Sequence, residues 1–317
     1  MHYSLERPHR TGRKPQITRV LAQGNPTALI RFLLWLCLLG PGVAWSQPAD
    51  PAWKFRLPDV LQEVSGLAIT GTEEFWWLND NDHPPTLYRT DGRGRLVDSI
   101  YLQGALNRDW EDLSTDNKGY FYIGDTGNNC NCRRDLRIYR YLPDSGELDS
   151  ILFRLPDQGQ FPPEQPRQNF DLEAFFWWND SLHLFSKNTL KGGNFYTKHY
   201  VLPDSPGNHV AELRDSLFLK KRVVTAAAIS DDGQTVALLA YHFRLFLGFI
   251  PSSKANVFFL EDYPAGHFLQ GKVRRKGIPP YFIATQWESV DFMNPDAVYV
   301  ASERTLFIRP KARRIRR

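Results

Sequence analysis

The sequence predicts an all-β fold, most simply a β-propeller of five blades, and three observations favour it. A pattern of strands and turns recurs along the chain, as in proteins built from repeats. Each recurring unit contains short strand patterns, up to four of them, and no long amphipathic helical pattern interrupts them. Aromatic residues make up 14% of the 317 residues, and glycine and proline number 22 each, a mix of strand formers and turn formers.

The repeat is clearest where each unit begins, at a polar residue that we call the slot residue. A small or apolar stretch, a turn and a second strand follow each slot residue. The five slot segments begin Ser65-Gly66-Leu67-Ala68, Glu111-Asp112-Leu113-Ser114, Glu173-Ala174-Phe175-Phe176, Thr225-Ala226-Ala227-Ala228 and Glu288-Ser289-Val290-Asp291. Gly119 and Gly233 fall at the same turn position of their units, and patterns for a third and a fourth strand recur further on. Four short strands with polar turns between them are typical of a propeller blade.

The last unit is shorter than a whole blade, because only 29 residues follow Glu288. Residues 47–64 precede the first unit, and apolar and charged side chains alternate there between 53 and 57. Such alternation indicates a strand. We therefore expect the N-terminal strand of the mature chain to complete the last blade and close the ring, which removes exposed sheet edges. The two longest intervals between slot residues, 62 and 63 residues, leave a sixth blade open as the alternative.

An export signal is indicated at residues 1–46. Arg31 precedes a short apolar run at 32–39, a Gly-Pro-Gly break follows, and small residues at 44 and 46 precede a cleavage point. A basic flank, a short apolar stretch and a small-residue exit are typical of a secretory signal peptide. The run is too short to favour a stable membrane span, and a retained N-terminal anchor is the alternative. We expect export to the periplasm or the extracellular space.

The rest of the chain divides into a propeller domain at 47–308 and a basic tail at 309–317. Without residues 1–46 and the six basic residues of the tail, the body carries 27 basic and 34 acidic residues, a net charge of −7. An acidic body is a poor match for nucleic acid and a better match for cations, so no nucleic-acid partner is expected. We expect a monomer whose tail is a solvated end, with a contact to phosphate or to a membrane surface as the alternative.

The mature chain keeps two cysteines, Cys130 and Cys132. Export permits a disulfide between them, although a single intervening residue makes such a bridge strained. Two free thiols in a loop are the equal alternative. A zinc site is not indicated, because the sequence offers no further ligands with close spacing nearby.

Acidic slot residues in three units predict a cation site in the central channel. If the slots occupy one end of the innermost strands, Glu111, Glu173 and Glu288 converge, and their summed negative charge is costly without a cation. Hard oxygen ligands suit Ca²⁺, and the slot residues Ser65 and Thr225 would add neutral oxygens. Three further acids stand two residues before a slot and deepen the negative field: Glu63, Asp109 and Asp171. The structural alternative is that backbone amides or arginines satisfy these acids.

A second set of polar residues follows at the end of the next strand and supplies candidate catalytic groups. Asp125, Lys187 and Glu303 fall there, together with Asp80. A spacing of 14 residues between the slot and the second set recurs in two units, which places both sets near one rim. The second set could form a substrate site with tuned pKa values, or it could consist of ordinary turn residues.

Other side chains that often mark a site are expected to be structural. His183 lies in a strand pattern and is expected to be a packing residue. The pairs Trp76-Trp77 and Trp177-Trp178 are expected in the core or between blades rather than on a sugar-binding platform.

Several segments resemble signatures of exported bacterial propeller proteins and, more distantly, of the SdiA-regulated family. The segments that carry this resemblance are Asp109-Trp110-Glu111-Asp112, Gly124-Asp125-Thr126-Gly127-Asn128-Asn129, Asn169-Phe170-Asp171-Leu172-Glu173-Ala174-Phe175 and Leu184-Phe185-Ser186-Lys187-Asn188. The resemblance covers most of residues 60–305. It implies a five-bladed, calcium-binding propeller and says little about activity.

The sequence therefore predicts an exported propeller with a central calcium site that acts as a ligand-binding or scaffold module, for a small molecule or a protein. The alternative function is a metal-assisted hydrolase of the lactone or phosphoester type. In that case Ca²⁺ would polarise the substrate, and Asp125, Lys187 or Glu303 would be the candidate acid–base groups.

Overall fold

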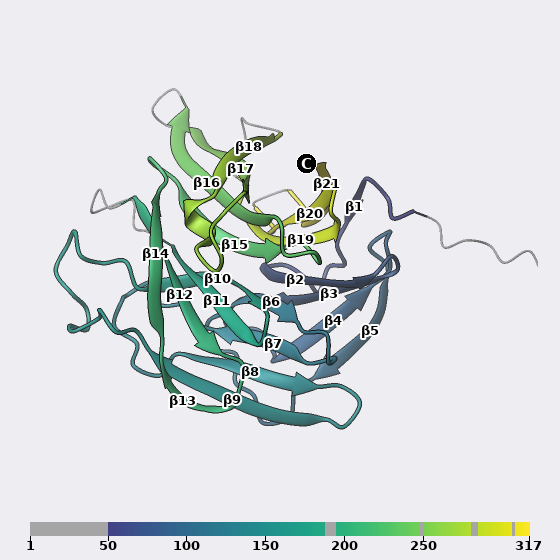
Figure 1. Ribbon diagram of the computed structural model, residues 1–317. Coiled ribbons are helices and arrows are strands. Elements are labelled where there is room, and N and C mark those ends of the chain that lie inside the picture. The colour runs from purple at the N-terminus through teal and green to yellow at the C-terminus, as the bar shows by residue number, and fades with distance from the viewer. Residues whose placement is uncertain (1–49, 188–194, 247–249, 280–284, 306–307) are drawn as a thin grey trace, which may run out of the picture. The chain divides into compact units, whose positions relative to one another are not determined.

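The structure is a computed structural model that describes residues 50–187, 195–246, 250–279, 285–305 and 308–317. These residues form five β-sheets, each with four principal strands (Figure 1). The one helical element among the described residues is the short 3₁₀ helix η1 at Phe268–Gln270. The predictions of an all-β class and of five propeller blades are thus confirmed. The expected signal peptide at 1–46 lies outside the described residues.

Each blade begins with the strand that carries a slot residue. Blade 1 consists of β2 (Val64–Gly71), β3 (Glu74–Asn79), β4 (Thr86–Thr90) and β5 (Leu96–Tyr101). Blade 2 consists of β6 (Trp110–Thr115), β7 (Phe121–Asp125), β8 (Arg137–Leu142) and β9 (Glu147–Arg154). Blade 3 consists of β10 (Asp171–Trp178), β11 (Ser181–Lys187), β12 (Tyr196–Pro203) and β14 (Glu212–Phe218). Blade 4 consists of β15 (Val223–Ile229), β16 (Val236–Phe246), β17 (Ile250–Glu261) and β18 (Lys272–Ile278).

Blade 5 combines the two ends of the described chain. It consists of β19 (Trp287–Asn294), β20 (Ala297–Ser302), β21 (Lys311–Arg316) and β1 (Lys54–Arg56). β1 pairs antiparallel with β21, so that Phe55 lies opposite Ala312. The slot-bearing strands β2, β6, β10, β15 and β19 contact one another in a closed cycle and surround the central channel (Figure 1).

The C-terminal residues 309–317 are not a solvated tail, and the structure corrects this expectation. Most of them form β21, which pairs with β20 on one side and with β1 on the other. Ala312 and Ile315 are buried, whereas the two arginines between them are half-buried. These are the two apolar residues of the strand, and its four basic residues therefore gave the segment the pattern of a solvated tail. The paired backbone and the buried stems of the basic side chains hold the segment in the sheet.

One strand joins a blade other than its own. β13 (Gly207–Val210) lies between β12 and β14 in the chain, yet it pairs in parallel with β9, the outer strand of blade 2. It covers an otherwise open sheet edge and ties blade 3 to blade 2. The sequence did not indicate this exchange, because a four-residue strand carries too little pattern to assign its partner.

Large aromatic side chains fill the space between neighbouring blades. Trp77 and Trp110 are completely buried. Trp76 of blade 1 meets Phe121 of blade 2 edge to face, with ring centroids 5.1 Å apart. The expectation that Trp76-Trp77 packs in the core is therefore confirmed. The second pair, Trp177-Trp178, is instead half-buried at one end of the channel.

A chain of buried polar rings crosses blade 3. His183 is 5% exposed, as expected for a packing residue, and its Nδ1 lies 3.0 Å from Nε2 of His199. Nδ1 of His199 lies 2.9 Å from Oδ1 of Asp215. Burial lowers the pKa of both rings, which favours their neutral forms. Burial, together with His199, lowers the pKa of His183 to about 3.

This histidine makes stability depend on pH. The unfolded chain protonates His183 near pH 6.5, whereas the folded chain does so only near pH 3. Between these values the unfolded state holds more protons, so the free energy of unfolding falls as the pH falls, by up to about 1.4 kcal/mol per pH unit. We expect His183→Gln, whose amide can still form a hydrogen bond with His199, to reduce this slope by up to one proton between about pH 4 and 6. Urea unfolding at several pH values measures both slopes, and equal slopes would contradict the assignment.

Candidate functional site

Carboxylates from three blades converge where the innermost strands begin. Glu111 of β6 lies beside Asp171 and Glu173 of β10, and one oxygen of each lies within 4.8 Å of the others. Glu111 also belongs to a second group with Asp80 and Asp109, to which the same limit of 4.8 Å applies. Glu111, Asp171 and Glu173 are at most 5% exposed. Burial raises the pKa of Glu111 well above its usual value, and repulsion from Glu173 adds to the effect.

One lysine shares this space with the acids. Lys187 ends β11, opposite Asp171 at the start of β10, and its ammonium forms an ion pair with Oε1 of Glu173. Burial alone would lower the pKa of Lys187, but Glu173 and the neighbouring acids outweigh burial and raise it, so the ammonium stays charged. Burial nevertheless keeps the pKa of Glu173 raised, although Lys187 opposes the shift. A single lysine therefore does not neutralise the cluster.

The third acidic slot residue, Glu288, faces the same end of the channel but stands in neither carboxylate group. Its Oε1 accepts a hydrogen bond of 3.2 Å from Nε2 of Gln286, and the same nitrogen donates to Oε2 of Glu303 at 2.9 Å. Burial and then repulsion from Glu288 raise the pKa of Glu303 to about 11. At neutral pH Glu303 is thus a neutral acid paired with Glu288, a different role from that of the Glu111 cluster.

The two neutral slot residues tie blades together. The hydroxyl of Ser65 in blade 1 donates to the carbonyl of Trp110 in blade 2, at 2.9 Å. The hydroxyl of Thr225 in blade 4 donates to the carbonyl of Trp287 in blade 5, at 2.8 Å. Both hydroxyls are therefore engaged with a neighbouring blade rather than aimed freely at the acids.

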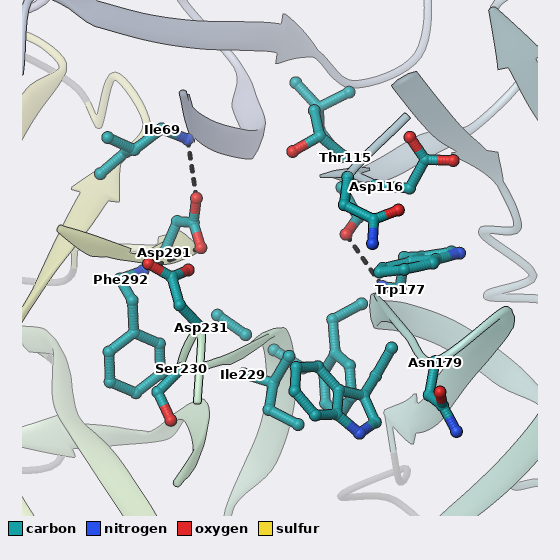
Figure 2. Close-up of a pocket in the computed structure, with 17 residues that line it drawn as sticks. Ile69, Thr115, Asp116, Trp177, Asn179, Ile229, Ser230, Asp231, Asp291 and Phe292 are labelled. Carbon is teal, nitrogen blue, oxygen red and sulfur yellow. Dashed lines mark hydrogen bonds between the residues drawn. The ribbon is translucent and has the colours of Figure 1, made fainter. Parts of the chain in front are cut away.

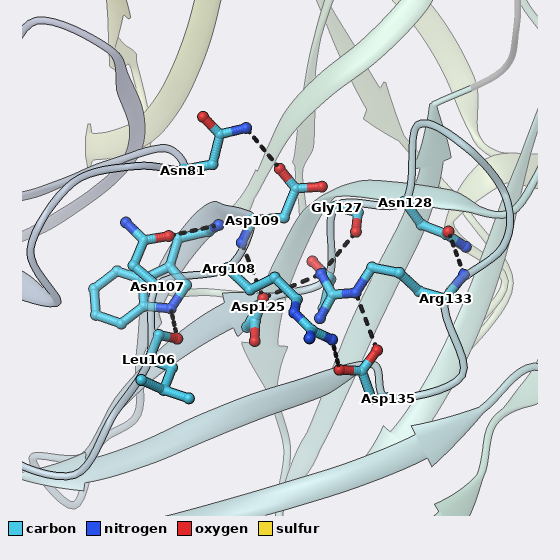
Figure 3. A network of polar contacts seen from close by, with 12 residues as sticks. Asn81, Leu106, Asn107, Arg108, Asp109, Asp125, Gly127, Asn128, Arg133 and Asp135 are labelled. Carbon is cyan, nitrogen blue, oxygen red and sulfur yellow. Dashed lines mark hydrogen bonds and ion pairs between the residues drawn. The ribbon is translucent and has the colours of Figure 1, made fainter.

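Asp125 is held in a network that positions the loop after β7 (Figure 3). Its Oδ1 accepts from the backbone N–H of Asp109 at 3.1 Å and lies 3.1 Å from Nη1 of Arg133. Nη1 of Arg133 also donates to the carbonyl of Gly127 at 2.8 Å, and Nε donates to Asp135 at 3.3 Å. Asp125 therefore acts through Arg133 and the backbone, and among the three candidate catalytic groups only Lys187 forms an ion pair with a carboxylate of the two groups.

Gly127 brings the backbone of this loop against the carboxylates. A Cβ added at Gly127 would lie much closer than 3.0 Å to Oε1 of Glu111 and to the carboxyl group of Asp109. The amide of Gly127 donates to the carbonyl of Asp109 at 3.1 Å, which fixes the approach. A side chain here would fill the space between the two acids.

Chemically, the cluster suits a hard divalent cation. Ca²⁺ binds oxygen ligands at about 2.3–2.6 Å, so two ligands across the ion are separated by about 5 Å at most. The limit of 4.8 Å between carboxylate oxygens fits this shell. Burial raises the pKa of Asp80 to about 7, and the pKa of Asp109 is raised by burial and by Asp171. The raised pKa values indicate that the positive charge near these acids is too small to offset burial and their mutual repulsion.

The sequence indicated some of these residues better than others. Asp109 and Asp171 were recognised as acids that deepen the field, and the structure places both in the cluster, whereas Glu63 lies at the exposed rim, 3.1 Å from His83. The sequence did not indicate Arg133, because nothing in its local pattern shows that it pairs with Asp125, eight residues earlier in the chain. Cys130 and Cys132, left open before, form a disulfide in the same loop region.

Comparison with known proteins gives structural neighbours only. No protein-family model matches the chain, and no curated protein does so either. An α-L-arabinanase from Penicillium chrysogenum, complexed with arabinobiose, is 9% identical, with a TM-score of 0.48 over 85% of this chain and 99% of its own. A PQQ-bound aldose sugar dehydrogenase from Streptomyces coelicolor is 10% identical, with a TM-score of 0.45 over 84% of this chain and 99% of its own. Neither similarity speaks to the activity of this chain.

Proposed function

We propose that this protein is an exported propeller that binds a divalent cation, calcium, and acts as a ligand-binding or scaffold module, as its resemblance to the SdiA-regulated propellers implies. The observation that carries the proposal is the position of Glu111, whose carboxylate belongs to two groups of acids at once, one buried and one partly exposed at Asp80 and Asp109. We assign the ligands to Glu111, Asp109, Asp171 and Glu173, with Asp80 at the edge.

Charge supports this assignment over purely structural satisfaction of the acids. Five carboxylates lie in the two groups, and the cationic groups that act most strongly on them are Lys187 and Arg133. Uncompensated buried charge is strongly destabilising, and a divalent ion would offset two charges. We assign Ser65 and Thr225 to the blade ties, and Glu288 to the pair with Glu303 rather than to direct coordination.

Calcium is therefore expected to raise the melting temperature of protein that has been treated with a chelator. Calcium at about 100 times its dissociation constant would stabilise the fold by about 2.7 kcal/mol. Glu111→Gln should abolish the shift because it removes the carboxylate that both groups share. Glu63→Gln, at the exposed rim, is the matched control and should retain the shift. Metal analysis and thermal unfolding measure the effect. Wild-type protein that holds no metal and keeps the same melting temperature with calcium would refute calcium binding.

The export part of the proposal is supported by the disulfide between Cys130 and Cys132, since such bonds persist in oxidising compartments. None of the helices in the part of the chain that the structure describes is long and apolar enough to cross a membrane. Cell fractionation of the full chain, and of the chain without residues 1–46, tests the route; equal retention of both in the cytoplasm would refute it.

The second candidate, a metal-assisted hydrolase of lactones or phosphoesters, is favoured by the charged ammonium of Lys187 within the acid cluster. A cation bound there would polarise a substrate oxygen, and Lys187 would orient the same substrate by its charge. A panel of lactones and phosphoesters distinguishes the candidates. Turnover that Glu111→Gln leaves intact would exclude this mechanism.

A further inference from the structure

A cavity lies at the opposite end of the innermost strands from the acids around Glu111, and no role assigned above uses it. It encloses about 470 Å³, within the range of small-molecule sites. Its walls come from the ends of the innermost strands and the turns that follow them: residues 113–117, 176–179, 227–231 and 291–292, together with Ile69. Figure 2 shows side chains of these segments arranged around the open space.

Two aspartates with different constraints face this cavity. Asp291 is fixed, because Oδ2 accepts from the backbone N–H of Ile69 at 2.7 Å and Oδ1 accepts from that of Phe292 at 2.8 Å. Asp231 lies beside it in Figure 2, and its negative charge acts on Asp291. Among the described residues, the side chain of Asp231 has no hydrogen bond or ion pair of its own, so its carboxylate is available to a ligand.

The aromatic wall is held in place by its neighbours in the fold. The backbone N–H of Trp177 donates to Oγ of Ser114 at 2.9 Å, and its indole Nε1 donates to Asp204 at 2.9 Å. The indole of Trp178 lies so close to Gly233 that a Cβ there would collide with it. Gly233 also has a φ of +65°, which disfavours other residues. The two indoles are thus pre-positioned without a ligand, which lowers the entropic cost of binding.

The charge of the lining decides which class of ligand fits. Three aspartates line the cavity, Asp116, Asp231 and Asp291, and none of the described lining residues is Lys, Arg or His. Asp116 is engaged within the fold, since its Oδ1 accepts from two backbone amides of its own turn and its Oδ2 accepts from the hydroxyl of Tyr122 at 3.1 Å. The nearby Lys118 is paired with Asp180 at 2.7 Å. The cavity therefore combines carboxyl groups that have no cationic partner in the lining with aromatic faces, the pair of features that recognises organic cations.

We propose that this cavity binds a small organic cation, a primary amine or a guanidine, through the carboxylates of Asp231 and Asp291. The carbon chain of such a ligand would lie along the indoles of Trp177 and Trp178. A neutral sugar would gain the aromatic contact but would leave the carboxylates without a charged partner. The proposal is independent of the cation site at the other end of the channel.

Calorimetric titration tests this with putrescine and agmatine as probes and with 1,4-butanediol and arabinose as neutral comparisons. The two amines should bind and the neutral compounds should not. Asp231→Asn should weaken amine binding about 10-fold, because it removes a charge but no contact within the fold. Asp98→Asn, an exposed position on the outer strand of blade 1, is the matched control and should bind as wild type does.

Glu111→Gln, at the other end of the channel, distinguishes the two sites for the amines. Glu111→Gln should leave amine binding unchanged, so loss of binding in that variant would assign the amines to the acid cluster instead. Amines that fail to bind, neutral compounds that bind equally well, or an Asp231→Asn variant with wild-type affinity would each overturn the proposal.

Discussion

Asp112→Ala is expected to lower the free energy of unfolding by about 3 kcal/mol or more, because it leaves three backbone donors without an acceptor in the middle of the channel. Asp112 is completely buried. Its Oδ1 accepts from the N–H of Leu113 at 2.9 Å, and its Oδ2 accepts from Phe175 at 3.0 Å and from Ala227 at 3.3 Å. One carboxylate thus joins the innermost strands of blades 2, 3 and 4. Denaturant unfolding measures the loss.

A neighbouring variant calibrates this effect. Ser114→Ala removes an acceptor from the same strand, but among the residues that the structure describes Oγ of Ser114 accepts from the N–H of Trp177 alone, at 2.9 Å. Its expected cost is about 1 kcal/mol. Asp112→Asn keeps the volume and one oxygen acceptor, so it should fall between the two alanine variants. Equal costs for Asp112→Ala and Ser114→Ala would show that the carboxylate does not join the blades in solution.

The repeat explains why the fold could be predicted from the sequence better than the site. The repeat predicts five equivalent strands, and equivalent strands must meet around one axis. The units of this repeat begin at Ser65, Glu111, Glu173, Thr225 and Glu288. Hydrophobic alternation marks most strands but fails for β21, whose sequence is dominated by arginine and lysine. It also fails for β13, because the partner of a short strand depends on the packing of blades rather than on local pattern.

The site could be predicted only to the level of its acids. Equivalent repeat positions placed Glu111 and Glu173 together, but the same symmetry also proposed Ser65 and Thr225, whose hydroxyls bond to the next blade. A repeat specifies the position of the backbone, whereas the direction and partner of each side chain depend on its neighbours. The role of Lys187 as a counter-charge depends on its place opposite Asp171 across a strand pair.

Gly127→Ala is expected to abolish calcium-dependent stabilisation, because the backbone of Gly127 lies directly against two of the acids. The new methyl group would occupy the space between Glu111 and Asp109, and both carboxylates would have to move apart. Overpacking of this kind typically costs about 1–3 kcal/mol, so the variant should still fold without calcium. Thermal unfolding with chelator and with calcium separates the small loss of stability from the complete loss of the calcium response.

Gly159→Ala is the control for this substitution. No atom lies within 4 Å of the Cβ that it would add, so the same chemical change occurs in open space. It should retain the full calcium response. If Gly127→Ala responds to calcium as Gly159→Ala does, an ion cannot be held between Glu111 and Asp109. The remaining group, formed by Glu111 with Asp171 and Glu173, would then have to hold a cation against the charge of Lys187. That competition makes a site at the remaining group alone much weaker, because the ammonium already occupies one oxygen of Glu173.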